Sequence, residues 1–325
     1  MKIVISDYEN VLQKDLSAAV WTIQAIIPES QIVIHAFREK EDFYQCMTDA
    51  EGLITAFLPV DAELFSHAPK LRCVSINAAG YNSVDLEAAK KNGITVCHVG
   101  EYCTEEVAEH TIALLCALNR NLKNYGYQLE KEENWQYAAL PGGKNLSGQT
   151  IAIFGFGKIG KRVAELARAL GMEILVVSSH LDDDTAEKYH IKKATEEEAF
   201  ERADVISNHM SLTADNYHFF NKEAFSKMKR KPLFLNLGRG GSVDEAALVS
   251  ALDEGILRGA GLDVLESESP DVKSCPLFHR ENVIITPHSA FYSEESLRKL
   301  QIISAENVAY VLKGEHKKVQ KNILF

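Results

Sequence analysis

The chain has 325 residues, which is too long for one typical hydrophobic core, so two domains are expected. Hydrophobic residues make up 46% of it and charged residues 25%, as in an ordinary globular protein, and the net charge of −11 without a basic block argues against nucleic-acid or anionic-membrane partners. No apolar run is long enough for a transmembrane helix, and the first residues lack the apolar region of a signal peptide.

Residues 2–98 alternate between short apolar runs and amphipathic segments. The apolar runs predict strands over 2–6, 32–35, 53–56, 71–76 and 93–97. The amphipathic segments predict helices over 11–27, 39–47, 61–65 and 84–91. Strands that alternate with helices in this way indicate a parallel sheet with helices on both faces.

A strong helix is predicted over 104–119, where Thr104 can cap the first turn and apolar residues recur at helical spacing. Residues 134–148 are polar and glycine-rich, which is typical of a loop leading into a second domain. A final amphipathic helix is expected over 294–313, crossing back to the first domain.

The stretch TIAIFGFGKIG, residues 150–160, joins a buried strand to a helix through Gly155, Gly157 and Gly160. The first glycine of such a G-x-G-x-x-G turn permits the bend. The second lets the backbone approach a pyrophosphate, and the third lets the helix pack close to the strand. The amides of Lys158 and Ile159, at the start of the helix, would hold the phosphates.

Five further strands are predicted after this turn, separated by helices, over 173–178, 204–208, 232–237, 259–264 and 283–286. With the strand at 150–154 they complete a six-stranded dinucleotide-binding fold.

Arg239, Glu268 and His288 each follow one of the last three strands. Because ligands bind outside the carboxyl ends of the strands in an open α/β sheet, these side chains can converge on one crevice. Arg239 could grip the carboxylate of a 2-oxo acid or polarise its ketone. His288 could give a proton to the alkoxide made by hydride addition, and Glu268 would favour the protonated imidazole.

The motifs together resemble the D-isomer-specific 2-hydroxyacid dehydrogenase family, which includes lactate, glycerate, hydroxypyruvate and phosphoglycerate enzymes. NAAGYNSVD at 77–85, VAEHTIALLCALNR at 107–120, GFGKIG, NLGRGG, GAGLDVLESESP and TPHSAFY follow the family's order and spacing. The resemblance implies an NAD(P)-dependent enzyme that interconverts a small D-2-hydroxy acid and its 2-oxo acid. It identifies Arg239, Glu268 and His288 as the catalytic residues.

The resemblance also implies a fold in which a Rossmann cofactor domain, 99–289, is inserted into a flavodoxin-like substrate domain, 1–98 and 290–325. The backbone at Ala79 and Gly80 would hold the substrate carboxylate. Because the helix at 105–119 commonly contributes to a dimer interface in this family, a homodimer is expected. The further residues that the family places at the cofactor are Met210, Ser211, Asn216, Leu237, Gly238 and Asp263.

The second strand of the cofactor domain departs from the family pattern. An acidic residue usually ends it and accepts hydrogen bonds from the adenosine ribose, but Ser178 stands in that place. Ser178, Ser179 and His180 could bind a 2′-phosphate, although no arginine accompanies them, or the serines simply end the strand. The cofactor is therefore NAD(H) or NADP(H).

Two more positions differ. Ser211 replaces a usual proline, which should alter loop stiffness more than chemistry, and Phe291 stands where lactate-type members often have tyrosine, which indicates a less polar pocket. Tyr102, Phe57 and Leu58 would form pocket walls, although core packing explains them equally well.

The six cysteines include no Cys-x-x-Cys pair, and no metal-ligand spacing occurs among cysteines and histidines. This pattern is typical of reduced thiols in a cytoplasmic protein, so we expect a cytoplasmic location and no metal site.

Two other functions stay open at this point. A dinucleotide-sensing protein that resembles the family's transcriptional corepressors could keep the same residues. A phosphite-type dehydrogenase would also keep the Arg, Glu and His. A formate enzyme is disfavoured because it uses glutamine where this chain has Glu268.

Overall fold

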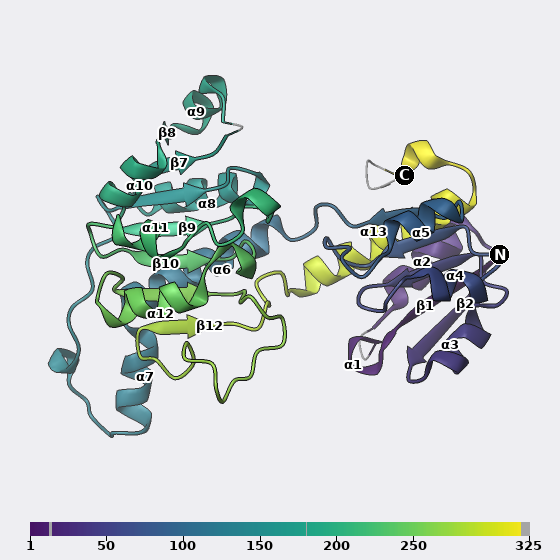
Figure 1. Ribbon diagram of the computed structural model, residues 1–325, viewed down its shortest axis with the longest axis horizontal. Coiled ribbons are helices and arrows are strands. Elements are labelled where there is room, and N and C mark those ends of the chain that lie inside the picture. The colour runs from purple at the N-terminus through teal and green to yellow at the C-terminus, as the bar shows by residue number, and fades with distance from the viewer. Residues whose placement is uncertain (13–14, 180, 320–325) are drawn as a thin grey trace. The chain divides into compact units, whose positions relative to one another are not determined.

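The computed structural model describes residues 1–12, 15–179 and 181–319, which form two compact units (Figure 1). Unit 1 comprises Met1–Tyr102 and Ser293–Phe325, and unit 2 comprises Cys103–Tyr292. Unit 2 is thus one continuous segment, whereas unit 1 is assembled from both sides of it. No helix within the described ranges is long and apolar enough to cross a membrane.

Unit 1 contains a five-stranded parallel sheet with the order β2-β1-β3-β4-β5. Its first strand has the residues expected of a buried strand, because Ile3, Val4 and Ile5 are β-branched and at most 4% exposed. The strands are β1 (Lys2–Tyr8), β2 (Gln31–Phe37), β3 (Gly52–Thr55), β4 (Cys73–Ile76) and β5 (Thr95–His98). The helices are α1 (Glu9–Leu12), α2 (Ser17–Ile26), α3 (Lys40–Met47), α4 (Ala62–His67), α5 (Leu86–Lys91) and α13 (Glu294–Leu312).

Helices cover both faces of this sheet. The C-terminal helix α13 buries Ala305, Val308 and Ala309 together with α2 on one face, while α3, α4 and α5 form a second apolar core on the other. A Cβ atom on Gly52 of β3 would lie 2.6 Å from Cγ2 of Val308, so the glycine permits the close approach of α13. Instead of the single helix expected over 11–27, α2 begins at Ser17, where the Asp15 carboxylate accepts the Ser17 amide at 2.9 Å.

Unit 2 contains a seven-stranded parallel sheet with the order β12-β11-β10-β9-β6-β7-β8. The strands are β6 (Thr150–Phe154), β7 (Glu173–Val177), β8 (Lys192–Lys193), β9 (Val205–Asn208), β10 (Leu233–Asn236), β11 (Gly259–Leu262) and β12 (Val283–Ile285). The helices are α6 (Thr104–Asn119), α7 (Leu122–Glu130), α8 (Lys158–Ala169), α9 (Asp183–Tyr189), α10 (Glu196–Arg202), α11 (Lys222–Ser226) and α12 (Glu245–Asp253).

The sheet of unit 2 also has one apolar core on each face. Phe154, Phe220 and Phe234 pack edge to face in one of them, and α6 and α8 pack over the other. The predicted class, two parallel-sheet α/β domains, is confirmed. Two elements of unit 2 were not predicted: α7 and the two-residue edge strand β8.

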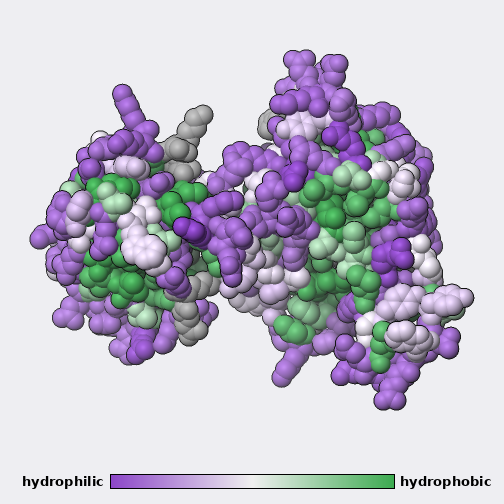
Figure 2. All heavy atoms as spheres, turned by 180° about the vertical axis from the view of Figure 1, so that it is seen from behind, coloured by the Kyte–Doolittle hydropathy of each residue, from purple (hydrophilic) through white to green (hydrophobic). Residues whose placement is uncertain are grey.

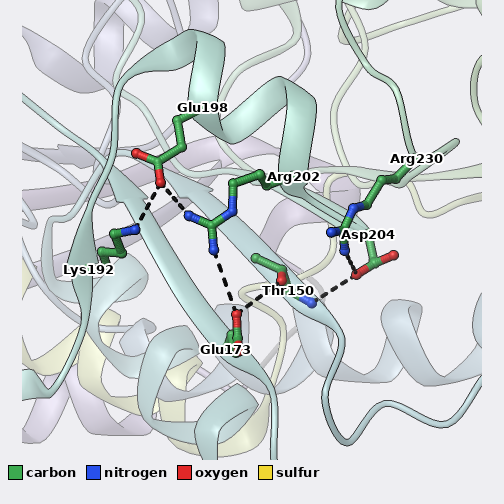
Figure 3. Close-up of polar contacts among 7 residues, drawn as sticks. All are labelled: Thr150, Glu173, Lys192, Glu198, Arg202, Asp204 and Arg230. Carbon is green, nitrogen blue, oxygen red and sulfur yellow. Dashed lines mark hydrogen bonds and ion pairs between the residues drawn. The ribbon is translucent and has the colours of Figure 1, made fainter.

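Hydrogen bonds and ion pairs of charged side chains link the amino ends of strands in unit 2 (Figure 3). The Glu198 carboxylate accepts hydrogen bonds from Lys192 at 3.0 Å and from Arg202. The buried carboxylate of Asp204, just before β9, accepts the Thr150 amide at 3.1 Å and pairs with Arg230 at 3.3 Å. This edge is therefore occupied by structural ion pairs, which leaves the carboxyl edge of the sheet for a ligand.

Candidate active site

The carboxyl ends of the strands of unit 2 meet at one edge, because all the strands are parallel. Chain order reverses between β6 and β9, which lie side by side, and ligands bind in open α/β sheets at such a reversal. The glycine turn follows β6 at this edge. Arg239 follows β10, Asp263 and Glu268 follow β11, and His288 follows β12.

The glycine turn is shaped for close backbone approach. Gly155 has φ +86°, and a Cβ atom there would lie 2.8 Å from the Met210 amide nitrogen. A Cβ atom on Gly160 would lie 2.3 Å from the carbonyl oxygen of Gly155. Gly157, in contrast, has open space around the position of a Cβ atom, directly before α8 begins at Lys158. An open glycine at a helix N-terminus fits the pyrophosphate of a dinucleotide.

The loop after β9 is braced by a side chain that was predicted to contact the cofactor. The Asn216 carboxamide accepts the Thr213 amide at 2.7 Å and donates to the Ser211 carbonyl at 2.8 Å. Met210, from the same loop, lies against the glycine turn. Asn216 therefore holds the shape of this loop, whatever else it contacts.

Arg239 is exposed and its guanidinium forms no ion pair with any residue in the described ranges. Its Nη1 donates only to the carbonyl of the preceding Gly238, at 2.9 Å. A Cβ atom on the following Gly240 would lie 1.8 Å from the Leu265 carbonyl oxygen, so only glycine fits there. The arrangement leaves an arginine fork free to bind a carboxylate.

A buried polar network that the sequence analysis missed fixes the turn at Arg239. The Arg239 carbonyl accepts hydrogen bonds from the Ser242 hydroxyl at 2.7 Å and from the Asn236 carboxamide at 3.2 Å. Asn208 donates to both of these side chains, at 2.8 and 2.9 Å. The signal in the sequence was that β9 and β10, two buried strands, both end in asparagine.

His288 and Glu268 form a close pair. The Nδ1 atom of His288 lies 2.8 Å from Oε2 of Glu268, and the two side chains are 43% and 65% exposed. A carboxylate can only accept a hydrogen bond, so Nδ1 carries the proton in this contact. The other ring nitrogen, Nε2, is then the one that can give a proton to a ligand or take one from it.

Asp263, 3% exposed, holds the loop that carries His288. Its carboxylate accepts the amides of Ser289 at 2.9 Å and Ala290 at 3.0 Å, and its carbonyl accepts the His288 amide at 2.8 Å. Leu237, which links β10 to this edge, is buried in the core of the unit. The expected positions of Asp263 and Leu237 beside the nicotinamide stay predictions.

Unit 1 contains the residues predicted to hold the substrate. Ala79 and Gly80 follow β4, and their amides donate to no carbonyl among the described residues. A Cβ atom at Gly80 would meet nothing within 4 Å, so this backbone is open to a ligand. Tyr102, at the end of the first segment of unit 1, is 9% exposed.

The two other suggested pocket walls differ from each other. Leu58 is 1% exposed and belongs to the core of unit 1, whereas Phe57 is 58% exposed. The buried carboxylate of Asp7, at the end of β1, accepts the amides of Ala56 at 2.6 Å and Phe57 at 3.1 Å. Core packing thus accounts for Leu58, and Phe57 alone remains available to a ligand.

Ser178 follows β7 directly, in the position predicted for the ribose-binding residue. His180 lies outside the described residues. Asp182 caps α9, and hydrogen bonds from the Thr185 hydroxyl and from the Thr185 amide, the latter at 2.7 Å, lower the pKa of the Asp182 carboxyl. Where the chain is described, no cluster of three His, Cys, Asp or Glu side chains is suited to a metal ion.

Comparison with known proteins gives consistent matches. The family described as "D-isomer specific 2-hydroxyacid dehydrogenase, NAD binding domain" matches residues 112–290. The chain is 35% identical over 291 residues to the glyoxylate reductase of Korarchaeum cryptofilum, covering 89% of this chain and 84% of that protein. It is 34% identical over 278 residues to the D-3-phosphoglycerate dehydrogenase of Methanocaldococcus jannaschii, covering 85% of this chain but 52% of that longer protein.

Solved structures agree with these matches. The D-lactate dehydrogenase of Aquifex aeolicus, crystallised with NAD and lactic acid, superimposes with a TM-score of 0.84 at 28% sequence identity. The superposition covers 99% of this chain and 98% of that one. The similarity therefore extends over both units of the chain.

Proposed function

Because this chain belongs to the D-isomer-specific 2-hydroxyacid dehydrogenase family, we propose that it reduces a short 2-oxo acid, of the size of glyoxylate, by means of Arg239, Glu268 and His288. Family membership confirms the resemblance inferred from its motifs. The chain is an oxidoreductase that transfers a hydride between a nicotinamide cofactor and a small D-2-hydroxy acid. The observation that carries the finer proposal is the 2.8 Å contact between His288 and Glu268, at the same sheet edge as Arg239, which forms no ion pair with the described part of the chain.

Arg239 binds the substrate in this proposal. A 2-oxo acid places a carboxylate next to its ketone, and the planar guanidinium can hold both oxygens in register. The guanidinium of Arg239 supports this role, because it forms no ion pair with the described residues. In unit 1, the open amides of Ala79 and Gly80 support binding of a substrate carboxylate by this backbone.

His288 delivers the proton. Reduction converts the ketone oxygen to an alkoxide, and the Nε2–H of protonated His288 neutralises it. Glu268 accepts from Nδ1, orients the ring and stabilises its positive charge. In the oxidative direction neutral His288 takes the hydroxyl proton back.

The glycine turn and the loops around it hold the cofactor in this proposal. The bound nicotinamide ring supplies the hydride in reduction and accepts it in oxidation. Gly155, Gly157 and Gly160 give the backbone its close approach, and the first amides of α8 donate to the pyrophosphate. Ser178 lacks the negative charge that would repel a 2′-phosphate, so we propose that both NADH and NADPH are accepted.

We assign cofactor binding to unit 2 and substrate binding to unit 1. The match of the family's NAD-binding domain to residues 112–290 supports the first assignment. The open backbone at Ala79 and Gly80 supports the second. The six cysteines form no disulfide bond within the described ranges, which supports a reducing compartment, and we propose the cytoplasm.

We further propose a homodimer formed through α6, α7 and the segment that follows them. Figure 1 shows α7 and this segment extending from the body of unit 2, and Figure 2 shows an apolar area on the rear face of that unit. Large apolar side chains are exposed along α7 and after it, to 85% for Trp135 and 89% for Tyr137. Such an apolar surface supports burial against a second copy. The other exposed members are Leu122, Tyr127 and Leu129.

The experiment is a panel of 2-oxo acids, matched ketones without the carboxylate, and phosphite, assayed with both cofactors by the absorbance of reduced nicotinamide. We expect oxo acids to be reduced by the wild-type protein. Arg239→Lys should lower kcat/KM for these acids by about 10–100-fold, because lysine keeps the positive charge but lacks the two parallel N–H donors of the guanidinium. Arg230→Lys, which alters an arginine at the opposite edge of the sheet, is the matched control and should leave kcat/KM unchanged. Equal losses for acid and ketone, or oxidation of phosphite alone, would overturn the proposal.

A further inference from the structure

The hydroxyl of Thr286 lies between a carboxylate and a histidine. Its Oγ1 donates to Oδ1 of Asp263 at 2.5 Å, and Nε2 of His110 lies 3.0 Å from the same Oγ1. A hydroxyl has one hydrogen, and an ionised carboxylate can only accept, so the hydroxyl hydrogen points to Asp263. His110 must therefore donate from Nε2 to the oxygen of Thr286.

This series of hydrogen bonds ends on the loop that carries His288. Oδ1 of Asp263 accepts the Ser289 amide as well as the Thr286 hydroxyl, and Oδ2 accepts the Ala290 amide. The backbone of His288 has φ +49°, in the left-handed region that favours glycine. A histidine stays in that conformation only where surrounding bonds hold it there.

His110, where this series of hydrogen bonds begins, belongs to a long and well-packed helix. His110 lies on α6, whose Val107, Leu114 and Leu118 are buried in the core beneath the sheet. Because α6 is well packed, it fixes the position of His110, whereas the other site residues lie on loops. His110, with 25% of its side chain exposed, thus links this helix to the Thr286 hydroxyl, and its Nε2 also lies 3.9 Å from Oδ1 of Asp263.

We propose that His110 is a positioning residue, which holds Asp263 through the Thr286 hydroxyl and so fixes the loop that places His288. The inference rests on the proposed function in one respect, that His288 transfers the proton. Removal of the His110 donor frees the Thr286 hydroxyl to turn, and the carboxylate loses its fixed third donor. The imidazole of His288 then samples orientations that do not reach the alkoxide.

The kinetic test uses variants that remove or keep single hydrogen-bonding groups. His110→Ala and Thr286→Val should each lower kcat for oxo-acid reduction by about 10–100-fold, with a smaller change in KM, because misplaced catalytic groups slow the chemical step more than binding. His110→Gln can still donate from a nitrogen near the position of Nε2, and Thr286→Ser keeps the hydroxyl. Both should recover most of the lost rate.

Two further measurements separate positioning from a general loss of stability. Because His110 and Thr286 act in series, the double variant His110→Ala/Thr286→Val should lose no more than the worse single variant. Thr111→Val removes a buried hydroxyl from the next position on the same helix, where it donates to the Val107 carbonyl at 2.7 Å. This control should leave kcat unchanged.

Hydrogen exchange of the Ser289 and Ala290 amides, followed by mass spectrometry, tests the inference without activity. Exchange should be faster in His110→Ala and Thr286→Val than in wild type, and unchanged in His110→Gln and Thr111→Val. If no oxo acid is reduced but exchange follows this pattern, the proposed function fails and the positioning role stands. Wild-type exchange and kcat in His110→Ala, or additive losses in the double variant, would overturn the positioning role.

Discussion

Acid should destabilise this protein through one enclosed histidine, His209. The residue follows β9, its Nε2 lies 2.8 Å from the Ser207 hydroxyl, and its Nδ1 is buried without a hydrogen-bond partner in the described part of the chain. Burial lowers the pKa of His209 from 6.5 to about 4. The folded protein therefore keeps this ring neutral at pH values where the unfolded chain binds a proton.

The sign and the size of the effect follow from this difference. Between pH 6.5 and 4 the unfolded state holds the extra proton, so the free energy of unfolding falls as the pH is lowered. The loss is about 1.4 kcal/mol at pH 5.5 and about 2.5 kcal/mol at pH 4.5, and it approaches about 3 kcal/mol below the folded pKa.

The assay is urea unfolding of wild type and His209→Gln at a series of pH values. Glutamine does not titrate, so the stability of the variant relative to wild type should rise by these amounts as the pH falls, while the carboxylates titrate alike in both proteins. A difference between His209→Gln and wild type that stays constant with pH would refute the argument from burial.

Four other substitutions test the site. His288→Ala should lower kcat by about 10²–10⁴-fold while the Kd for reduced cofactor is kept, and near-wild-type turnover would remove His288 from the mechanism. Glu268→Gln removes the charge that stabilises the imidazolium, so kcat for reduction should fall; an unchanged kcat would show that the two residues are uncoupled. Ser178→Asp should raise the ratio of kcat/KM for NADH over NADPH, and a fixed ratio would mean that Ser178 does not face the ribose. Gly160→Ala would place a methyl group 2.3 Å from the Gly155 carbonyl, so titration should show weaker cofactor binding, and an unchanged Kd would argue against the glycine turn as the phosphate site.

The sequence predicted best what short motifs encode. The spacing of Gly155, Gly157 and Gly160 required a strand before it and a helix after it, and β6 and α8 are in those places. The parallel sheets followed from apolar runs that alternate with amphipathic segments. The edge strand β8 has no such signal, because it consists of Lys192 and Lys193 alone.

Interactions between distant parts of the sequence were not predictable in this way. Asn208 meets Ser242 across 34 positions, and His110 meets Thr286 across 176, so no local pattern records either contact. These buried polar groups were hidden for the same physical reason: each is satisfied only by a partner that the fold brings to it. Arg239, Glu268 and His288 were predicted from motifs, but the polar networks of Asn208 and His110 that hold their loops were not.

The division of unit 1 between two chain segments has a consequence for biosynthesis. A ribosome makes β1 to β5 first and then all of residues 103–292 before α13 emerges, an interval of roughly 10–40 s at about 5–20 residues per second. During that time Ile54, Cys73 and Cys97 lack the α13 side chains that cover them in the finished fold. The nascent chain thus carries an apolar sheet face that α2 covers only in part while unit 2, being continuous, can already fold, which makes the first unit the part of the protein that most needs protection by chaperones.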